Sequence, residues 1–346
     1  MKLKIITALF IVFGLVFILK FFLFNETEKN KSFNFDENAT GPKIIIPVQS
    51  QKSNKRNIKE LNTYFLKKIN LEDLNILQPY KICSVDSNFV YILDFSVPCV
   101  KQLNLETHNI KIYGKGKGTG PGELLNPTDF TVDGQKNVWI LDGAQNSVLK
   151  FDSKGNFLFS IKPNYLVYRI GINRQNKVYL VSSSSKNLFH QFNENQFIKS
   201  FGEIISEQEK FAILLSGKLS IDNNDNLYFT NDRSYLLISY KQDGELRFAI
   251  NTIEGDNLLP EPSVMNKDII VLPKKFTNID IRNNASNIFI LNREGMSDKS
   301  FIDIYSNLDG LYKYSFVVPH KILSFSVILD KLFFVDDYYL YIFNFK

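Results

Sequence analysis

The chain has 346 residues, of which 44% are hydrophobic, 14% aromatic and 22% charged. This balance excludes a disordered or collagen-like protein, because the apolar content can build a core. The net charge of +5 is too small an excess to predict nucleic-acid binding. Two cysteines exclude a disulfide-rich scaffold, and three histidines argue against a multi-histidine metal site.

Residues 1–24 predict a membrane anchor. Lys2 and Lys4 precede the apolar run Ile5–Phe24, which is interrupted by Lys20 and has about the 20 residues that cross a bilayer. No small-residue cleavage site and no lipid-carrying cysteine follows the run. We expect an uncleaved single-pass anchor in the cell membrane, with the N-terminus in the cytoplasm and the remainder in the periplasm or outside the cell. A cleaved signal peptide is the alternative.

Residues 25–60 predict a flexible linker between this anchor and a domain at residues 61–346. The segment is rich in Asn, Lys, Glu and Ser, and only Ile44–Val48 is apolar. Such a composition buries too little apolar surface to fold alone.

A repeat runs through residues 61–346. Six short apolar runs share an aromatic residue, followed three residues later by a small polar one. The aromatic residues stand 40 to 61 residues apart and are Tyr91, Trp139, Tyr179, Tyr228, Phe289 and Phe333. The runs are rich in Val, Ile, Tyr and Phe and are bounded by Asn, Asp and Gly, which is typical of strands. Only Glu207–Leu215 suggests one or two helical turns.

This period predicts an all-β fold, a six-bladed β-propeller of four-stranded antiparallel blades, preceded by one transmembrane helix. A repeat of roughly 40–50 residues with about four short strands is typical of a propeller blade. Only 13 residues follow Phe333, so the last blade lacks one strand. Residues 64–72 can supply the missing outer strand and close the ring, paired with residues 340–346, which we expect to form an inner strand of that blade.

Residues 113–155 resemble an NHL repeat, through the lead-in at Gly114–Glu123, the strand at 137–142 and the hairpin at Lys150–Gly155. Residues 65–94 are similar to the start of uncharacterised six-bladed β-propeller proteins of Bacteroidota. The resemblance implies the propeller fold for residues 62–346. It carries no agreed catalytic residues, so it implies no activity.

The recurring polar position after each aromatic residue has two interpretations. It is occupied by Asp94, Asp142, Asn231, Asn292 and Asp336, with Ser182 in the third blade. A ring of carboxylates would suit a cation or acid–base chemistry. Because the position recurs in every blade, we favour a structural role, in which each side chain caps the turn that ends its strand.

Cations that break the repeat are the candidate ligand-binding residues. They are Lys115, Lys117, Arg169, Arg233 and Arg293. Links between blades and links between second and third strands share one face of a propeller. We therefore expect these side chains on that face, where Arg233 and Arg293 would form a fork-shaped anion site. A solvated surface is the alternative.

Other reactive residues favour structural roles. Gly114–Gly122 lacks the Lys-Ser/Thr ending of a phosphate loop and precedes a strand, so we expect an inter-blade loop. His108, His190 and His320 share no repeat position, which disfavours the histidine-held zinc of NHL-like amidating lyases. Cys83 and Cys99 would begin the first and third strands of blade one, too far apart for an easy disulfide. A bridge and free thiols are both left as alternatives.

We therefore expect a non-enzymatic, envelope-facing binding module for a protein, peptide or glycan, without a cofactor or metal and without nucleic acid. A rigid ring with variable loops on one face suits that role. The alternative is a metal-dependent lyase or lactonase with its site in the propeller channel.

Overall fold

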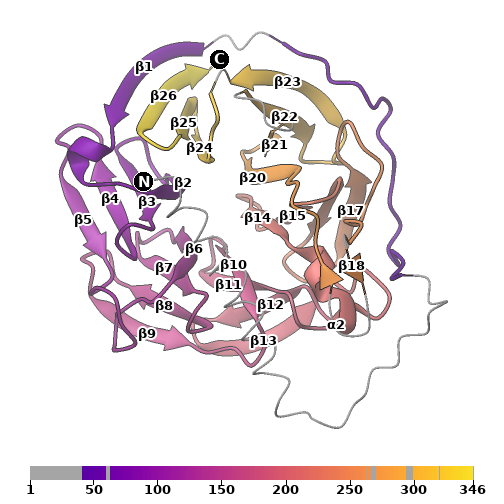
Figure 1. Ribbon diagram of the computed structural model, residues 1–346, viewed down its shortest axis with the longest axis horizontal. Coiled ribbons are helices and arrows are strands. Elements are labelled where there is room, and N and C mark those ends of the chain that lie inside the picture. Colours follow the sequence, from indigo (N-terminus) through magenta and orange to yellow (C-terminus); the bar gives the residue numbers. More distant parts are fainter. Residues whose placement is uncertain are drawn as a thin grey trace. The chain divides into compact units, whose positions relative to one another are not determined.

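The computed structural model describes residues 41–59, 63–262, 264–265, 270–293, 299–318 and 320–345, and the chain forms two compact units. The smaller unit includes the two-stranded sheet of β18 (Val264–Met265) and β19 (Ile270–Val271). The larger unit holds six four-stranded antiparallel sheets, arranged as the blades of a ring (Figure 1). The predicted six-bladed propeller is therefore confirmed.

The predicted transmembrane helix of residues 1–24 lies outside the described residues. Within the described ranges, no helix has the length needed to span a bilayer.

Blades one to five are simple meanders, in which consecutive strands run from the inside of the ring to its rim. Their strands are β2 (Pro79–Cys83), β3 (Phe89–Asp94), β4 (Cys99–Asn104) and β5 (Ile110–Tyr113); β6 (Pro127–Val132), β7 (Val138–Asp142), β8 (Ser147–Phe151) and β9 (Phe157–Ile161); β10 (Val167–Ile172), β11 (Lys177–Ser182), β12 (Phe189–Asn193) and β13 (Gln196–Phe201); β14 (Gly217–Ile221), β15 (Leu227–Asn231), β16 (Leu236–Tyr240) and β17 (Leu246–Asn251); and β20 (Asn278–Asn283), β21 (Asn287–Asn292), β22 (Ser300–Ser306) and β23 (Tyr312–Val318).

The sixth blade closes the ring with both ends of the chain. Its inner strands are β24 (Ser324–Ile328) and β25 (Lys331–Val335), and β26 (Tyr339–Phe345) follows them. The outermost strand is β1 (Thr63–Asn70), which pairs with β26. The predicted pairing is confirmed, although β26 is the third strand of its blade rather than an inner one.

Short helical turns occupy two links. The 3₁₀ turn η2 (Glu72–Leu74) joins β1 to the first blade. The turn α2 (Gln208–Phe211) and the 3₁₀ turn η3 (Ala212–Leu215) join blades three and four, where the sequence predicted one or two helical turns.

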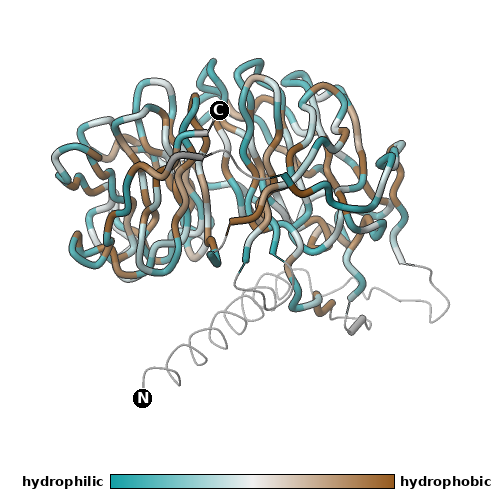
Figure 2. Tube along the Cα trace, turned by 90° about the horizontal axis from the view of Figure 1, so that it is seen from above, coloured by the Kyte–Doolittle hydropathy of each residue, from teal (hydrophilic) through white to brown (hydrophobic). Residues whose placement is uncertain are grey.

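The core lies between neighbouring blades. All six recurring aromatic residues are in the second strands, and none exposes more than 1% of its surface. Residues of adjacent second strands, such as Ile92 and Phe333, share one apolar cluster. Figure 2 shows the apolar segments within the blades and hydrophilic loops at both faces. A single blade cannot bury both of its faces, so the ring is the smallest stable unit.

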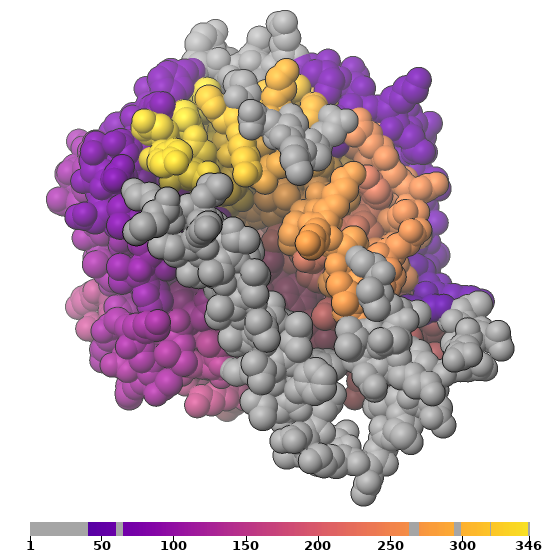
Figure 3. Space-filling model, viewed as in Figure 1, coloured from indigo at the N-terminus to yellow at the C-terminus, as the bar shows by residue number. Residues whose placement is uncertain are grey.

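Residues 42–59, within the predicted linker, lie along the rim. This segment, here the strap, follows the outer strands of blades four and five (Figures 1 and 3, indigo). Isolated β-bridges join Gln49 to Ile250 and Ile58 to Ser315. The Gln51 side chain donates to the carbonyls of Asn251 and Gly310, at 3.0 Å each. This part of the predicted linker is therefore bound to both blades.

Candidate functional site

Ionisable side chains occupy one level of five inner strands. Lys81, Asp129, Arg169, Lys218 and Asp280 each pair with the residue before the recurring polar position of their blade. Blade six has Ser324 at this level, opposite Val335. Inner strands begin at the link face, the face formed by the links between blades and the links between second and third strands. This set, the axial ring, therefore lies near the mouth of the propeller at that face.

Electrostatic contacts show that these residues converge on the axis. The pKa of Lys218 on blade four is influenced by Arg169 on blade three, Tyr80 on blade one and Asp280 on blade five. Blades one and four are opposite each other in a ring of six. A side chain that senses both sides of the ring must lie close to its axis.

The first part of the ring is a closed network around Asp129. Its carboxylate accepts from the Lys81 ammonium and, at 2.9 Å, from the backbone N–H of Ile170. Lys81 also donates to the carbonyl of Phe130 at 3.0 Å. Burial raises the pKa of Asp129, but Lys81 and Arg169 lower it more, so the pKa lies below its usual value. Blades one, two and three are thereby joined through one carboxylate.

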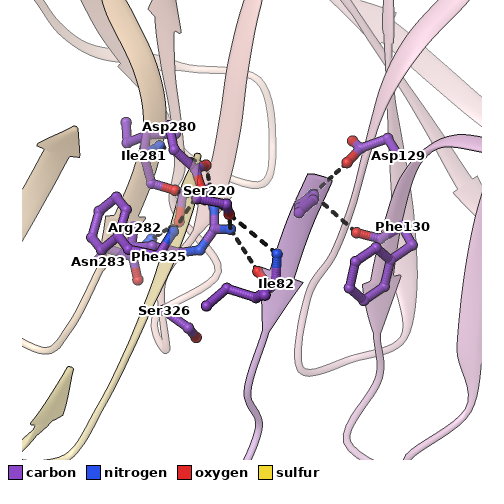
Figure 4. Close-up of polar contacts among 12 residues, drawn as sticks. Ile82, Asp129, Phe130, Ser220, Asp280, Ile281, Arg282, Asn283, Phe325 and Ser326 are labelled. Atoms are coloured by element: carbon purple, nitrogen blue, oxygen red, sulfur yellow. Dashed lines mark hydrogen bonds and ion pairs between the residues drawn. The ribbon is translucent and has the colours of Figure 1, made fainter. Parts of the chain in front are cut away.

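A second closed network surrounds Asp280 (Figure 4). Its carboxylate accepts from Arg282 Nη1 and Ser324 Oγ, at 2.6 Å each. Arg282 Nη2 donates to the carbonyl of Ile82 at 2.9 Å. Blades five, six and one are joined in this way, and Asn283 donates to Ser220 of blade four at 2.7 Å.

Arg169 and Lys218 have no such network. Arg169 Nη1 donates to the carbonyl of Tyr168 at 2.7 Å, and no described residue pairs with either charge at ion-pair distance. Both residues are partly exposed. Burial and the neighbouring Arg169 lower the pKa of Lys218. Burial also lowers the pKa of Arg169, but Tyr80, Asp129 and Asp232 raise it more.

The other predicted ligand residues are dispersed. Lys115 and Lys117 are exposed in the link between blades one and two, a compact loop closed by the Lys115 N–H and the Gly122 carbonyl at 2.8 Å. Gly114 and Gly122 adopt φ of 119° and 83°, the left-handed region that suits glycine. This loop leads into β6, as expected for an inter-blade loop.

Arg233 and Arg293 are held by different loops. Arg233 donates to Asp232 at 2.9 Å and to the Pro273 carbonyl at 3.0 Å. Arg293 Nη2 donates to the Ile322 carbonyl at 2.6 Å, and burial lowers its pKa. No contact between the two guanidinium groups is found in the described residues. The fork-shaped anion site formed by Arg233 and Arg293 therefore stays a prediction.

The recurring polar residues bind backbone. The carboxylate of Asp142 accepts from the N–H groups of Leu125 and Asn126 in the preceding link, at 2.6 and 3.2 Å, and of Ala144 and Gln145 in the following turn.

Asp94 accepts in the same way from Leu77, Gln78 and Ser96, and also binds Lys101. Asn231 binds the Leu214 carbonyl, and Asn292 is buried opposite Asn278. Asp336 lies one residue beyond β25 and caps only its own turn, at Tyr338 and Tyr339.

The histidines lie away from the axial ring. His108 is in the turn before β5, and its Nε2 is 2.8 Å from Lys67 Nζ. His190, in β12, stacks on Tyr165 with ring centroids 3.7 Å apart. His320 precedes β24 and stacks on Tyr341. Among the described residues, no group of three His, Cys, Asp or Glu side chains is placed to hold a metal ion.

The two cysteines are free. Cys83 ends β2 and Cys99 begins β4, so in this antiparallel blade they lie at opposite ends as well as two strands apart. The expectation that both begin their strands is therefore wrong for Cys83. Burial raises the pKa of both thiols, that of Cys99 to about 11.

A cavity of about 400 Å³ lies at the opposite face, between blades one and two. Its lining includes Phe89, Asn104, Asn109 and Lys111. Lys111 is tied to the Ser153 carbonyl at 3.0 Å.

Sequence reasoning found Arg169 but missed the rest of the axial ring. A usable signal was present, because Lys81, Asp129, Arg169 and Lys218 each stand thirteen residues before the recurring polar position of their blade. An ionisable residue at a fixed distance before a buried strand marks the inner strand, which carries no aromatic signature of its own.

Known structures share the fold at low identity. A putative exported protein from Bacteroides fragilis is 12% identical, with a TM-score of 0.57, over 86% of this chain and 98% of that chain. Virginiamycin B lyase from Staphylococcus aureus is 13% identical, with a TM-score of 0.53, over 82% of this chain and 100% of that chain. A member of the duf4221 family from Bacteroides vulgatus is 12% identical, with a TM-score of 0.54, over 83% and 99%.

No curated protein matches the chain. A family model described as a 6-bladed beta-propeller matches residues 107–294. This match spans more than half of the sequence and agrees with the observed ring of six blades. The chain therefore belongs to this 6-bladed beta-propeller family.

Proposed function

We propose that this protein is a non-enzymatic binding module of the cell envelope, which takes a protein, peptide or glycan at the axial ring. Ionisable side chains from five blades lie at one level near the axis, and this arrangement supports the proposal. Ion pairs and backbone hydrogen bonds hold Lys81, Asp129, Asp280 and Arg282 in place. Recognition groups that are fixed before binding lose little conformational entropy when the ligand arrives.

The envelope location rests on the sequence of residues 1–24. The test is fractionation of cells followed by N-terminal sequencing of the protein. Recovery from membranes with residues 1–24 present supports the anchor, whereas a soluble form that begins near residues 25–40 contradicts it.

The binding proposal is tested with purified full-length protein on peptide and oligosaccharide arrays. We expect the unchanged protein to bind at least one probe, and Arg169→Gln to lose that binding. Lys111→Gln, at the cavity on the opposite face, is the matched control and should bind as before. Loss with Lys111→Gln alone would move the ligand to that cavity and contradict the axial site.

The alternative is a metal-dependent lyase or lactonase. Two streptogramin-type lyases are among the similar structures, but at 12–13% identity this likeness supports the fold alone. Mass spectrometry of the bound probe, together with metal analysis of the protein, decides between them. A chemically changed probe and a stoichiometric divalent ion would favour the enzyme.

A further inference from the structure

The positive charges near the axis are not all matched by negative ones. Lys81 pairs with Asp129, Arg282 with Asp280 and Arg233 with Asp232. Arg169 and Lys218, on the neighbouring inner strands β10 and β14, have no such partner in the described part of the chain. Two positive charges therefore remain on one side of the ring.

Both residues also have unused hydrogen-bond donors. A guanidinium group has five N–H donors and an ammonium group three. Arg169 uses one nitrogen, Nη1, and the Lys218 ammonium has no hydrogen-bond partner among the described residues. Arg169 and Lys218 are both partly exposed, and their free donor atoms are not among the fully buried polar atoms without a partner.

The adjacent carboxylates cannot fill this role. Asp129 is occupied by Lys81 and the Ile170 N–H. Asp232 accepts from Arg233 at 2.9 Å and from Ser216 Oγ at 3.0 Å. Neither has an ion-pair contact with Arg169 or Lys218.

A fixed hydroxyl group lies across the ring. Tyr80 on blade one is close enough to influence the pKa of both Arg169 and Lys218. Its ring stacks on Phe95 with centroids 4.4 Å apart, and 38% of its surface is exposed. Tyr80 can therefore donate to a group that occupies the space beside the two cations.

We infer that Arg169 and Lys218, assisted by Tyr80, bind an oxyanion of the ligand, a carboxylate or a phosphate. This inference rests on the proposed binding function and names the chemistry of its axial site. Guanidinium pairs with planar oxyanions through two parallel hydrogen bonds, and ammonium adds a second charge. Such an anion would relieve the repulsion between the two neighbouring cations, which now disfavours the charged form of Lys218.

The test is isothermal titration calorimetry of the full-length protein with sodium acetate and, separately, sodium phosphate. We expect the unchanged protein to bind at least one of them. Lys218→Met should weaken that binding at least about tenfold, as expected for loss of one charge-assisted hydrogen bond. Preference for acetate would identify a carboxylate ligand, and preference for phosphate a phosphorylated one.

Lys154→Met is the matched control, since Lys154 is an exposed lysine in the turn between β8 and β9. It removes the same charge far from the inner strands and should leave affinity unchanged. Lys218→Met should also leave the melting temperature without anion unchanged or higher, because the folded state disfavours the charge at this position. A binding loss with intact melting therefore cannot be attributed to unfolding.

Two results would overturn the inference: neither anion binds, or Lys218→Met binds as well as the unchanged protein. If neither anion binds while an array probe is still lost with Arg169→Gln, the axial binding function stands and the oxyanion chemistry fails. If an anion binds at this pair while the arrays show no ligand, the oxyanion site stands and the proposed macromolecular ligand fails.

Discussion

The contact that holds the strap to blade five predicts a large loss of stability in Arg56→Met. Arg56 Nε and Nη2 donate to the two carboxylate oxygens of Asp303, at 2.8 and 3.0 Å. The two side chains expose 6% and 0% of their surface. Removal of one partner from a buried ion pair costs about 3–5 kcal/mol, because the other charge is left without compensation. Asp303 keeps the Ser315 hydroxyl at 2.6 Å, so we expect about 3 kcal/mol.

For a domain of this size, about 3 kcal/mol corresponds to a melting temperature about 5 °C lower. The assay is differential scanning calorimetry of the full-length protein. Lys55→Met is the control, since the neighbouring Lys55 is exposed and its side chain has no ion pair with a described residue. The double variant Arg56→Met with Asp303→Asn should recover part of the loss, because no buried carboxylate is left without Arg56, and Glu254, the second partner of Arg56, is exposed. Equal melting temperatures for Arg56→Met and Lys55→Met would refute the reasoning and leave the strap without an anchoring role.

Three further predictions concern the blades. Asp142→Ala should cost about 3 kcal/mol in chemical denaturation, because four backbone N–H groups lose their acceptor. Asp336→Ala should cost only about 1 kcal/mol, since Asp336 caps one turn; equal losses would contradict this difference. Burial lowers the pKa of His190 to about 4, so its contribution to stability, about 3 kcal/mol at most, is present above pH 6.5 and is lost as the pH falls toward 4. His190→Gln should lack this part of the pH dependence in melting curves, and identical curves would argue against the lowered pKa. Removal of residues 340–346 takes away most of β26, which pairs with both β1 and β25, and should abolish cooperative unfolding in circular dichroism; a truncated chain that melts like the intact one would refute ring closure by β26.

The blades could be predicted because their strongest signal is local. Aromatic and β-branched residues of each second strand are buried on both sides, so the strand appears in the sequence as a short, continuous apolar run. Inner strands have mixed polarity, as in Val167–Ile172, where Arg169 lies between buried residues. Their ionisable residues meet only when six segments, tens of residues apart, surround one axis. No pattern within a single blade indicates that convergence, and only the comparison of several blades does.

The strap was missed for a different reason. Residues 42–59 bind through backbone hydrogen bonds, the Gln51 amide and the Arg56 ion pair rather than through an apolar stripe. Polar segments of this composition usually remain unfolded, because they bury too little apolar surface. Here the partners are unpaired edges of β17 and β23, which supply the hydrogen bonds that the segment cannot make with itself.

Blade four differs from blades one, two, three and five at the place where Lys218, one of the two unmatched charges, lies. Inner strands of blades one, two, three and five have a register shift before the axial residue, whereas β14 pairs without one. Its recurring position is Asn231 rather than an aspartate, and the following Asp232 is neutralised by Arg233. Among the described residues, Lys218 is therefore without a carboxylate partner, whereas Lys81 of blade one pairs with Asp129 of blade two. Positions that repeat are constrained by folding in every blade, so a position that departs from the repeat is where a ring of similar units can acquire a specific ligand.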